Sequence, residues 1–484
     1  MIKVGAQVEH AEFGIGKVLS VLGSVATVDF FGEALDVDVN DLATRGGDGR
    51  SAAVLTAGRT TTDLAFRKSF EAVNLGVVPA DPEQLVRLTI GGDEVSHEIR
   101  SVLRDAPTHG ACRVFIGYYG SGKSHHLQLV KAIALREGWV VAPLELDPKA
   151  ADPAKPSSVY QALLSGLEFP ERSDGRHSED FFDLVKEMRD AWPRIRSLRY
   201  FTRSPWFSKG MEALQYFSHR RDNPDYVAGV SWLAGQVSQI SAIRSTSWRA
   251  GYREHIPTMP RTKDAGLIYA FHLVVIHEVV KELGYKGLAV IVDEAEHIRT
   301  YSANRYLRAN NFLDVLSRCA HPPRADLADP HCDHDVSGLP PFWKEGPHFG
   351  LFIGLTEGED LQQGAEEMSV LVHTHQDVVH LESPSAADYE AWSTAFLAEA
   401  ADRLGPRVEL LADSALRARI VGTLRQHFDQ TPASEKLLRN WTKMAGFPAA
   451  VLLSHERAFD GEELVLIVED AARQIAGEVL PWDD

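Results

Sequence analysis

The stretch GYYGSGKS at residues 117–124 decides the fold, with an apolar run before it and a helix-favouring segment after it. It fits the pattern G-x-x-x-x-G-K-S in full. Its glycines let the backbone wrap tightly around phosphate oxygens and offer them several N–H donors. A helix starting near Lys123 adds the partial positive charge of its N-terminus. The stretch therefore predicts a phosphate-binding loop (P-loop) between a buried strand and a helix.

The side chains of this loop suit ATP with a magnesium ion. Lys123 is expected to reach the β- and γ-phosphates and so to act in catalysis, and the Ser124 hydroxyl is expected to bind Mg²⁺. The other positions predicted to hold the nucleotide are Gly117, Gly120, Ser121 and Gly122. The alternative is a glycine turn without a ligand, and the apolar run before the loop together with the helix after it argue against it.

A second motif, LAVIVDE at residues 288–294, places two acidic residues after an apolar run. This is the pattern of a Walker B strand. Asp293 is predicted to hold magnesium, and Glu294 to polarise the attacking water. Buried strands often end in an acidic residue, so the motif gains its meaning from the P-loop. The pair predicts an enzyme that hydrolyses ATP.

A third apolar run, FGLFIGLTE at residues 349–357, ends in a polar residue. In P-loop ATPases with an additional strand, a polar residue at the end of the strand after Walker B contacts the γ-phosphate or the lytic water. Thr356 is the candidate for this catalytic position. The alternative is an ordinary strand end capped by threonine.

An oligomeric ATPase would also need a cation from a neighbouring subunit. Five candidates follow Walker B: Arg299, Arg305, Arg308, Arg318 and Arg324. Most of them are expected to be solvated surface residues. Arg439, in the segment EKLLRNW at residues 435–441, is a candidate arginine of a helical lid. An exposed helix arginine is the alternative.

Apolar runs and helical patterns alternate along most of the chain. Strands are expected at residues 113–116, 140–146, 288–292, 351–355 and 378–381, and helices from 123, at 158–167 and at 265–283. The alternation predicts an α/β fold whose parallel sheet is covered on both faces. We expect a P-loop core of the AAA+ type over residues 62–384, a helical basic insertion over about 170–263, and a helical C-terminal lid over 385–484.

The first 43 residues have a different pattern. Valines alternate with other residues, and glycines recur at Gly14, Gly16, Gly23 and Gly32. Short strands with tight turns are expected, arranged as a small β-barrel of SH3 or Tudor type. The glycine-containing segment 44–61 is the expected linker.

Composition narrows the class of protein. The length of 484 residues suggests roughly three domains. The net charge of −18 argues against a general nucleic-acid coat protein. The three cysteines Cys112, Cys319 and Cys332 do not form a disulfide framework, so a reducing, cytoplasmic location is expected. No membrane span is expected, since polar residues interrupt the most apolar helix candidate at 266–280.

Residues 192–263 are rich in both basic and aromatic side chains. The basic residues are Arg194, Arg196, Arg199, Arg203, Lys209, Arg220, Arg221, Arg244, Arg249, Arg253, Arg261 and Lys263. The interleaved aromatic residues are Trp192, Tyr200, Phe201, Trp206, Tyr216, Phe217, Trp232, Trp248 and Tyr252. Such a mixture suits nucleic-acid backbones and bases, and DNA is the expected partner. In the alternative reading, the aromatics form a core and the arginines pair with acids elsewhere.

A group of cysteines and histidines lies between the second and third motifs: Cys319, His321, His331, Cys332 and His334. These residue types bind zinc, but their spacing matches no common zinc site. A loop with incidental histidines is the preferred interpretation.

The P-loop context, GYYGSGKSHHLQLVKAIALREG, resembles the ATP-binding domain of BREX-type phage-defence proteins, especially the BrxD-like ones. The resemblance extends through AFRKSFEAVNLGVVPADPEQLVRL, GYKGLAVIVDEAEHI and NRYLRANNFLDVL, over about residues 66–356. It implies nucleotide binding by Gly117, Gly122, Lys123 and Ser124, with Asp293 and Glu294 as the Walker B pair. Where the family usually has one histidine and two leucines after GKS, this chain has His125, His126 and Leu127.

The BREX-type domains are similar to AAA+ and origin-recognition ATPases. This implies a core sheet, a helical lid, possible homo-oligomers, and action beside helicase, methyltransferase or nuclease partners. The segment VEHAEFGIGKVLSVLGSVATVDFFG is similar to the Tudor-like modules of CarD and UvrD-type proteins, which contact RNA polymerase or other proteins. Three functions follow: a motor or switch ATPase of phage defence acting on DNA, a nucleotide-gated scaffold with slow turnover, or a transcription regulator docked through the barrel.

Overall fold

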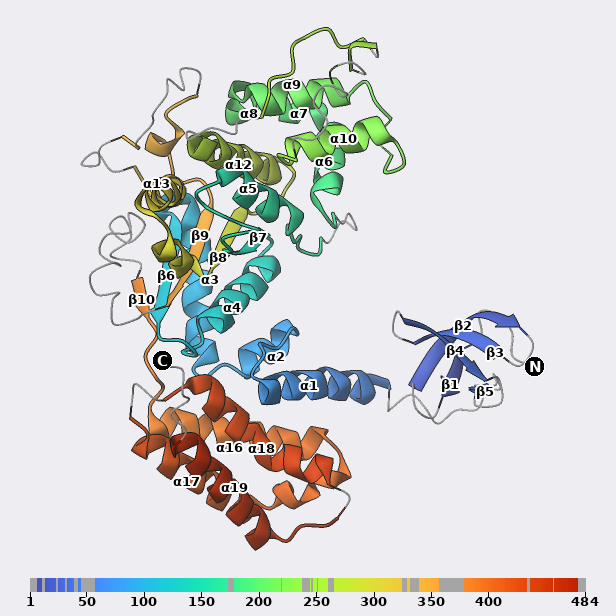
Figure 1. The fold of residues 1–484 in the computed structure, drawn as a ribbon, viewed down its shortest axis with the longest axis vertical. Helices are drawn as coiled ribbons and strands as arrows, with labels where there is room; N and C mark the ends of the chain where they lie inside the picture. The colour runs from blue at the N-terminus through green and yellow to red at the C-terminus, as the bar shows by residue number, and fades with distance from the viewer. Residues whose placement is uncertain are drawn as a thin grey trace. The chain divides into compact units, whose positions relative to one another are not determined.

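The computed structural model divides the chain into two compact units, Met1–Thr62 and Asp63–Asp484 (Figure 1). In the first unit it describes the strands within residues 7–44. From residue 57 onward it describes residues 57–172, 178–218, 220–236, 244, 247–249, 251–259, 265–323, 329–330, 339–356, 378–432, 436–455 and 457–477.

The first unit contains an antiparallel sheet. Its strands are β1 (Gln7–His10), β2 (Gly14–Leu22), β3 (Val25–Phe30), β4 (Glu33–Asp38) and β5 (Leu42–Thr44). They pair in the order β4-β3-β2-β1-β5, and a register shift interrupts the pairing of β2 with β3. Short strands were expected here. Closure into a barrel and the Tudor-like identity remain predictions, and most of the expected linker lies outside the described residues.

The second unit is built on a parallel sheet, which confirms the expected α/β architecture. Its strands are β6 (Ala111–Gly117), β7 (Val140–Glu145), β8 (Leu288–Asp293), β9 (Gly350–Thr356) and β10 (Val378–His380), in the order β10-β6-β9-β8-β7. β9 therefore lies between the strand before the P-loop and the Walker B strand. In the pairing register Gly117 lies opposite Thr356, and Asp293 opposite Glu145. The carboxyl ends of these strands meet at one edge, as parallel pairing requires.

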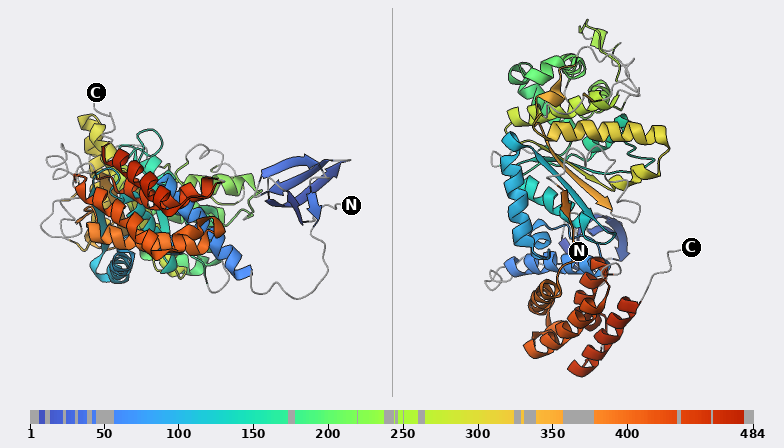
Figure 2. Two further views of the ribbon diagram at one scale, coloured as in Figure 1. Left: turned by 90° about the horizontal axis from the view of Figure 1, so that it is seen from below. Right: turned by 90° about the vertical axis from the view of Figure 1, so that its left-hand side faces the viewer.

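Helices cover both faces of this sheet (Figure 2). On one face lie α2 (Pro82–Arg87), α3 (Gly92–His109) and α4 (Lys123–Arg136), and on the other lie α5 (Pro156–Ser165), α12 (Ala265–Glu282) and α13 (Ala303–Ala320). Successive strand residues point to opposite sides. Phe115 thus packs in the core with α3 and α4, whereas Val114 and Ile116 pack in the core with α12. Being buried on both faces explains why these strands are continuous apolar runs.

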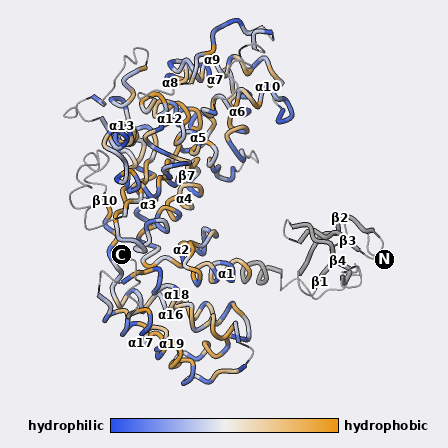
Figure 3. Tube along the Cα trace, viewed as in Figure 1, coloured by the Kyte–Doolittle hydropathy of each residue, from blue (hydrophilic) through white to orange (hydrophobic). Residues whose placement is uncertain are grey.

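α12 is buried along almost its whole length, and Figure 3 shows its apolar residues. The insertion before it contributes short helices to the same core: α6 (Phe181–Asp190), α7 (Trp192–Ile195), α8 (Arg199–Arg203), α9 (Pro205–Leu214) and α10 (Pro224–Leu233). Side-chain caps define where three of them begin. Asp180 caps α6, Ser204 caps α9 and Asn223 caps α10.

The C-terminal helices enclose a core of their own. They are α16 (Ala386–Arg403), α17 (Ser414–Gln430), α18 (Leu438–Ser454) and α19 (Gly461–Gly477), with the 3₁₀ segment η5 (Pro406–Ala412). α1 (Ala57–Leu75) packs into this core, where Phe70 stacks on Phe396 with 5.5 Å between ring centroids. The segment before the P-loop is thereby joined to the helices at the end of the chain. Among the described helices, none combines the length and apolarity that crossing a membrane requires.

Candidate functional site

The predicted P-loop connects β6 to α4 as the sequence motif requires. Gly120 has a φ of 77° and Gly122 a φ of 99°, which side chains other than glycine rarely tolerate. A Cβ atom at Gly117 would clash with Ser121 Oγ. The Ser121 hydroxyl is buried and has no hydrogen-bond partner among the described residues. A loop with enforced glycines and an orphaned buried hydroxyl fits the cradle of a phosphate group.

Lys123 opens α4 and is buried, with 8% of its surface exposed. Its Nζ donates hydrogen bonds to the carbonyl oxygens of Gly117 (3.2 Å) and Tyr118 (3.1 Å). Burial lowers the pKa of Lys123. Three carboxylates oppose that effect, in decreasing order Glu296, Asp293 and Glu294. The ammonium therefore lies within the field of all three acids.

The Walker B residues lie at the end of β8, beside β9. A Cβ atom at Gly354 of β9 would come within 2.7 Å of Asp293 Oδ1, so glycine at this position leaves room for the carboxylate. Asp293 Oδ1 accepts a hydrogen bond from the Glu294 N–H at 2.9 Å. Among the described residues, Glu294 is the only one besides glycine with a positive φ, at 59°. Backbone strain of this kind is concentrated at functional positions.

Two predicted catalytic side chains have partners within the protein. Glu294 Oε2 lies 2.8 Å from His297 Nε2, in the 3₁₀ segment η2 (Ala295–Thr300). Glu296, also in η2, accepts the Thr356 N–H at 3.2 Å and the Thr356 hydroxyl through its other oxygen. The end of β9 is thus tied to the turn that follows Walker B.

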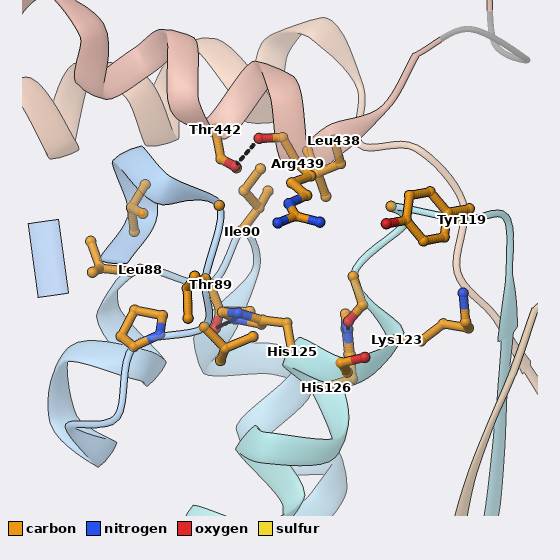
Figure 4. A pocket seen from close by; sticks show the side chains of 18 of the residues that line it. Leu88, Thr89, Ile90, Tyr119, Lys123, His125, His126, Leu438, Arg439 and Thr442 are labelled. Atoms are coloured by element: carbon orange, nitrogen blue, oxygen red, sulfur yellow. Dashed lines mark hydrogen bonds between the residues drawn. The ribbon is translucent and has the colours of Figure 1, made fainter. Parts of the chain in front are cut away.

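A cavity of about 420 Å³ brings these groups together (Figure 4). Its polar lining includes Lys123, Ser124, Asp293, Glu294, Glu296 and Thr356, together with Gly120 and Gly122 of the loop. Its apolar lining includes Val77, Val78, Pro79, Leu88, Ile90, Trp392 and Leu438. Gly117 and Ser121 belong to the same loop. A cavity lined by both polar and apolar side chains has the size and character of a small-molecule site and fits a nucleotide.

The C-terminal helices supply one wall of the cavity. Leu438, Arg439 and Thr442 line it from the first turns of α18 (Figure 4). The Arg439 N–H contacts the Gly120 carbonyl at 3.4 Å. A Cβ atom at Gly76, just after α1, would lie 2.6 Å from Arg439 Nε. The predicted lid arginine is therefore placed between the P-loop and the segment that follows α1.

The histidine pair after the P-loop also belongs to this region. His125 Nε2 lies 2.6 Å from Thr89 Oγ1, and the Thr89 hydroxyl donates to the Leu85 carbonyl at 2.7 Å. Because that hydroxyl proton is used, His125 Nε2 must carry the hydrogen. Burial, aided by the neighbouring His126, lowers the pKa of His125 to about 3. His125 is thus neutral and links α4 to the end of α2.

Sequence reasoning missed Glu296, His125 and Thr89 as cavity residues. Glu296 carried a signal, since it is the third acidic residue of the stretch DEAE at 293–296. His125 matches the histidine that the family usually has after GKS, so it carried no signal of its own. Thr89 lies between α2 and α3, in a stretch whose sequence pattern is helical, and it carried no signal.

Four of the five arginines proposed as a cation for a neighbouring subunit are described, namely Arg299, Arg305, Arg308 and Arg318, and none of these four lines the cavity. Arg305 pairs with Asp152 at 3.1 Å, and Arg318 pairs with Asp314 at 3.0 Å. Arg308 contacts a carbonyl of its own helix, and Arg324 lies outside the described residues. Intramolecular pairing makes Arg305 and Arg318 poorer candidates for a cation donated to a neighbouring subunit.

The cysteine and histidine group is only partly described. Cys319 is buried in α13, whereas His331, Cys332 and His334 lie outside the described residues. Within the described ranges there is no group of three or more potential metal-ligating His, Cys, Asp or Glu side chains.

The structure of the basic stretch favours the alternative interpretation, in which its aromatic residues form a core and its arginines pair with acids. Its aromatic residues Tyr200, Phe201, Phe217, Trp232 and Tyr252 are buried in the core. Five of its cations pair with acids: Arg194 with Glu282, Arg199 with Glu345, Lys209 with Glu254, Arg220 with Asp222 and Arg221 with Asp180. Trp248 and Tyr216 are exposed, and Arg253 lies over the Trp248 ring at 4.3 Å. Arg261 and Lys263 lie outside the described residues.

The parallel sheet, its covering helices and the GYYGSGKS loop are compatible with a P-loop nucleotide-binding protein. The BREX system ATP-binding protein family BrxC/D matches residues 65–183 and 178–321, and the chain belongs to this family. No curated protein and no solved structure matches the chain.

Proposed function

We propose that this protein is a magnesium-dependent ATP hydrolase that acts as a switch or motor in BREX phage defence. The family supports ATP binding and the link to BREX. The observation that supports hydrolysis is that one cavity is lined by four of the expected side chains: Lys123, Asp293, Glu294 and Thr356.

Each side chain has a chemical task in this proposal. The apolar part of the cavity would take the nucleobase, and Lys123 with the loop N–H groups would bind the phosphates. Ser124 and Asp293 would hold Mg²⁺, which supplies charge neutralisation at the phosphates. Glu294 would accept a proton from the attacking water, and the Thr356 hydroxyl would donate to the γ-phosphate.

The decisive experiment measures ATP turnover by the purified full chain, alone and with duplex DNA, beside Glu294→Gln. We expect turnover in the unchanged protein and loss of about 10²-fold or more in the variant, with ATP still bound. Undiminished turnover in Glu294→Gln would remove this residue from the mechanism.

A second function, a nucleotide-gated scaffold with slow turnover, is favoured by a specific observation. Glu294 is paired with His297, and Thr356 with Glu296, so both predicted catalytic groups are engaged elsewhere. A protein in this state would bind ATP well and turn it over only after a partner rearranges the site. Negligible turnover with retained ATP binding, raised by added BREX proteins, would support this function.

Other parts of the proposal concern partners. Self-assembly and action beside a helicase, methyltransferase or nuclease rest on the family resemblance. Docking through the N-terminal unit rests on its similarity to Tudor-like modules, and DNA binding rests on the basic and aromatic stretch 192–263. Stimulation of turnover by DNA is the first test of DNA binding. Because five basic residues of 192–263 are paired with acids, we expect any DNA contact to involve other, exposed groups such as Trp248 and Arg253.

A further inference from the structure

Glu296 is a cavity residue without a role in the proposed reaction. It lies in η2, three residues after Asp293, and lines the cavity beside Lys123. Both of its carboxylate oxygens are engaged by Thr356, one by the backbone N–H and one by the hydroxyl. Among the three acids that face Lys123, Glu296 has the strongest electrostatic effect on it.

The contact has a consequence for the Thr356 hydroxyl. A hydroxyl has one proton to donate. While that proton is donated to Glu296, it is not available to a phosphate oxygen. A phosphate group that reaches Thr356 must therefore replace Glu296 as the acceptor, and the freed carboxylate would stand next to another anion.

Charge makes this replacement selective. A nucleoside triphosphate carries a further phosphate beyond that of a diphosphate, and the predicted place of this phosphate is beside Thr356. Like charges within a few ångströms repel, and the repulsion is stronger where water is partly excluded. A carboxylate at this position therefore disfavours the triphosphate more than the diphosphate.

We propose that Glu296 is a positioning residue. It holds Thr356 in the nucleotide-free protein, and it sets the preference of the nucleotide site between ATP and ADP. The γ-phosphate displaces Glu296 from Thr356, and η2 is the element that senses its arrival. The inference rests on the proposed nucleotide site, but it does not require hydrolysis.

The test compares equilibrium binding of Mg-ADP and a non-hydrolysable ATP analogue to the full chain. Glu296→Gln keeps the shape and an acceptor oxygen but removes the charge. We expect the analogue to bind about tenfold more tightly, and ADP affinity to change by less than about twofold. Glu145→Gln is the matched control, because Glu145 ends β7 in register with Asp293 but does not line the cavity. It should alter neither affinity.

Thr356→Val examines the same contact from its other side. It should weaken the analogue and leave ADP unchanged, because the hydroxyl that would donate to the γ-phosphate is lost. If Glu296→Gln does not fold, the affinities of Thr356→Val for ADP and for the analogue still test the inference.

Equal changes in both affinities, or weaker binding of the analogue to Glu296→Gln, would overturn the inference. The latter result would indicate that the carboxylate helps to hold magnesium. Turnover that is insensitive to Glu294→Gln would remove Glu294 from the proposed mechanism, and absent turnover would remove the proposed hydrolysis; either result leaves this comparison of affinities standing.

Discussion

Lys123 shows at the scale of one residue how the site is prepared for an anion. Its ammonium is buried and satisfied by two carbonyls of its own loop, which is a weak substitute for phosphate oxygens. Charge-assisted hydrogen bonds are shorter and about twice as strong as neutral ones. ATP binding should therefore draw much of its affinity from this side chain.

Lys123→Ala should lose about 10–100-fold in ATP affinity, since a hydrogen bond to a charged group contributes about 1.5–3 kcal/mol. Calorimetric titration with Mg-ATP measures the effect. Lys131→Ala is the control, because Lys131 lies on the same helix and pairs with Glu168 away from the cavity. Equal affinity in the unchanged chain and Lys123→Ala would refute the assignment of the P-loop.

Arg439 allows a comparable test of the lid. Its side chain lines the cavity from α18, so Arg439→Ala should weaken ATP binding by about tenfold through the loss of one cation. Arg425→Ala removes an exposed arginine of α17 that pairs with Glu390, and it should leave the affinity unchanged. A similar loss in both variants would point to general electrostatics instead of a lid contact.

At the scale of elements, the close approach of β8 and β9 fixes the Walker B carboxylate. Gly354→Ala would place a methyl group 2.7 Å from Asp293 Oδ1 and 3.0 Å from Leu127 Cδ1. The carboxylate must then move, and we expect magnesium-dependent ATP binding to fall by at least about tenfold, or about 1.4 kcal/mol. Titration with and without Mg²⁺ measures this.

Gly422→Ala is the control for that substitution. A Cβ atom there meets nothing within 4 Å, and the position is inside α17. Alanine in a helix interior is favoured over glycine by up to about 1 kcal/mol, so this variant should melt at the same or a higher temperature and bind ATP normally. Loss of binding in both variants would show that the effect is not local to Asp293.

The elements that sequence reasoning predicted well are those with a strong local pattern. β8, β9 and α12 are continuous apolar runs because they are buried on all sides, and the loop before α4 is marked by its glycines. The contact of Glu296 with Thr356 spans 60 residues of sequence and exists only because β9 lies next to β8. No local pattern could have predicted it.

The basic insertion also contains a long-range contact that the local sequence could not predict. Arg199 pairs with Glu345, which is 146 residues further along the chain. In the sequence, Arg199 stands among other cations, and this pattern predicts a basic surface. Only the packing of α8 against the segment near Glu345 reveals its partner, so a count of basic residues overestimates the free positive charge.

At the scale of the whole molecule, buried histidines couple stability to pH. Burial lowers the pKa of His125, His272 and His277 to about 3 each, with small further effects from neighbouring charges for two of them. An unfolded histidine titrates near 6.5. Their contribution to folding is therefore present above pH 6.5 and is lost as pH falls below it, by about 1.4 kcal/mol per pH unit for each group.

His272 isolates this effect because its ring is fully buried among Tyr160, Tyr269 and Trp206, and neither ring nitrogen has a partner among the described residues. His272→Phe should keep the packing. Its melting temperature should fall less between pH 7.5 and pH 5.5 than that of the unchanged protein. The exposed His97, changed to Gln, is the control. An unchanged pH dependence in His272→Phe would contradict the assignment.

The backbone of Glu294 has a consequence for how this protein could evolve. A side chain in the left-handed region costs about 1–2 kcal/mol, a strain that glycine would relieve. Selection for stability alone would therefore replace the acid with glycine and yield a more stable protein without the proposed general base. Descendants that have abandoned turnover but kept nucleotide binding are the ones in which we would look for that replacement.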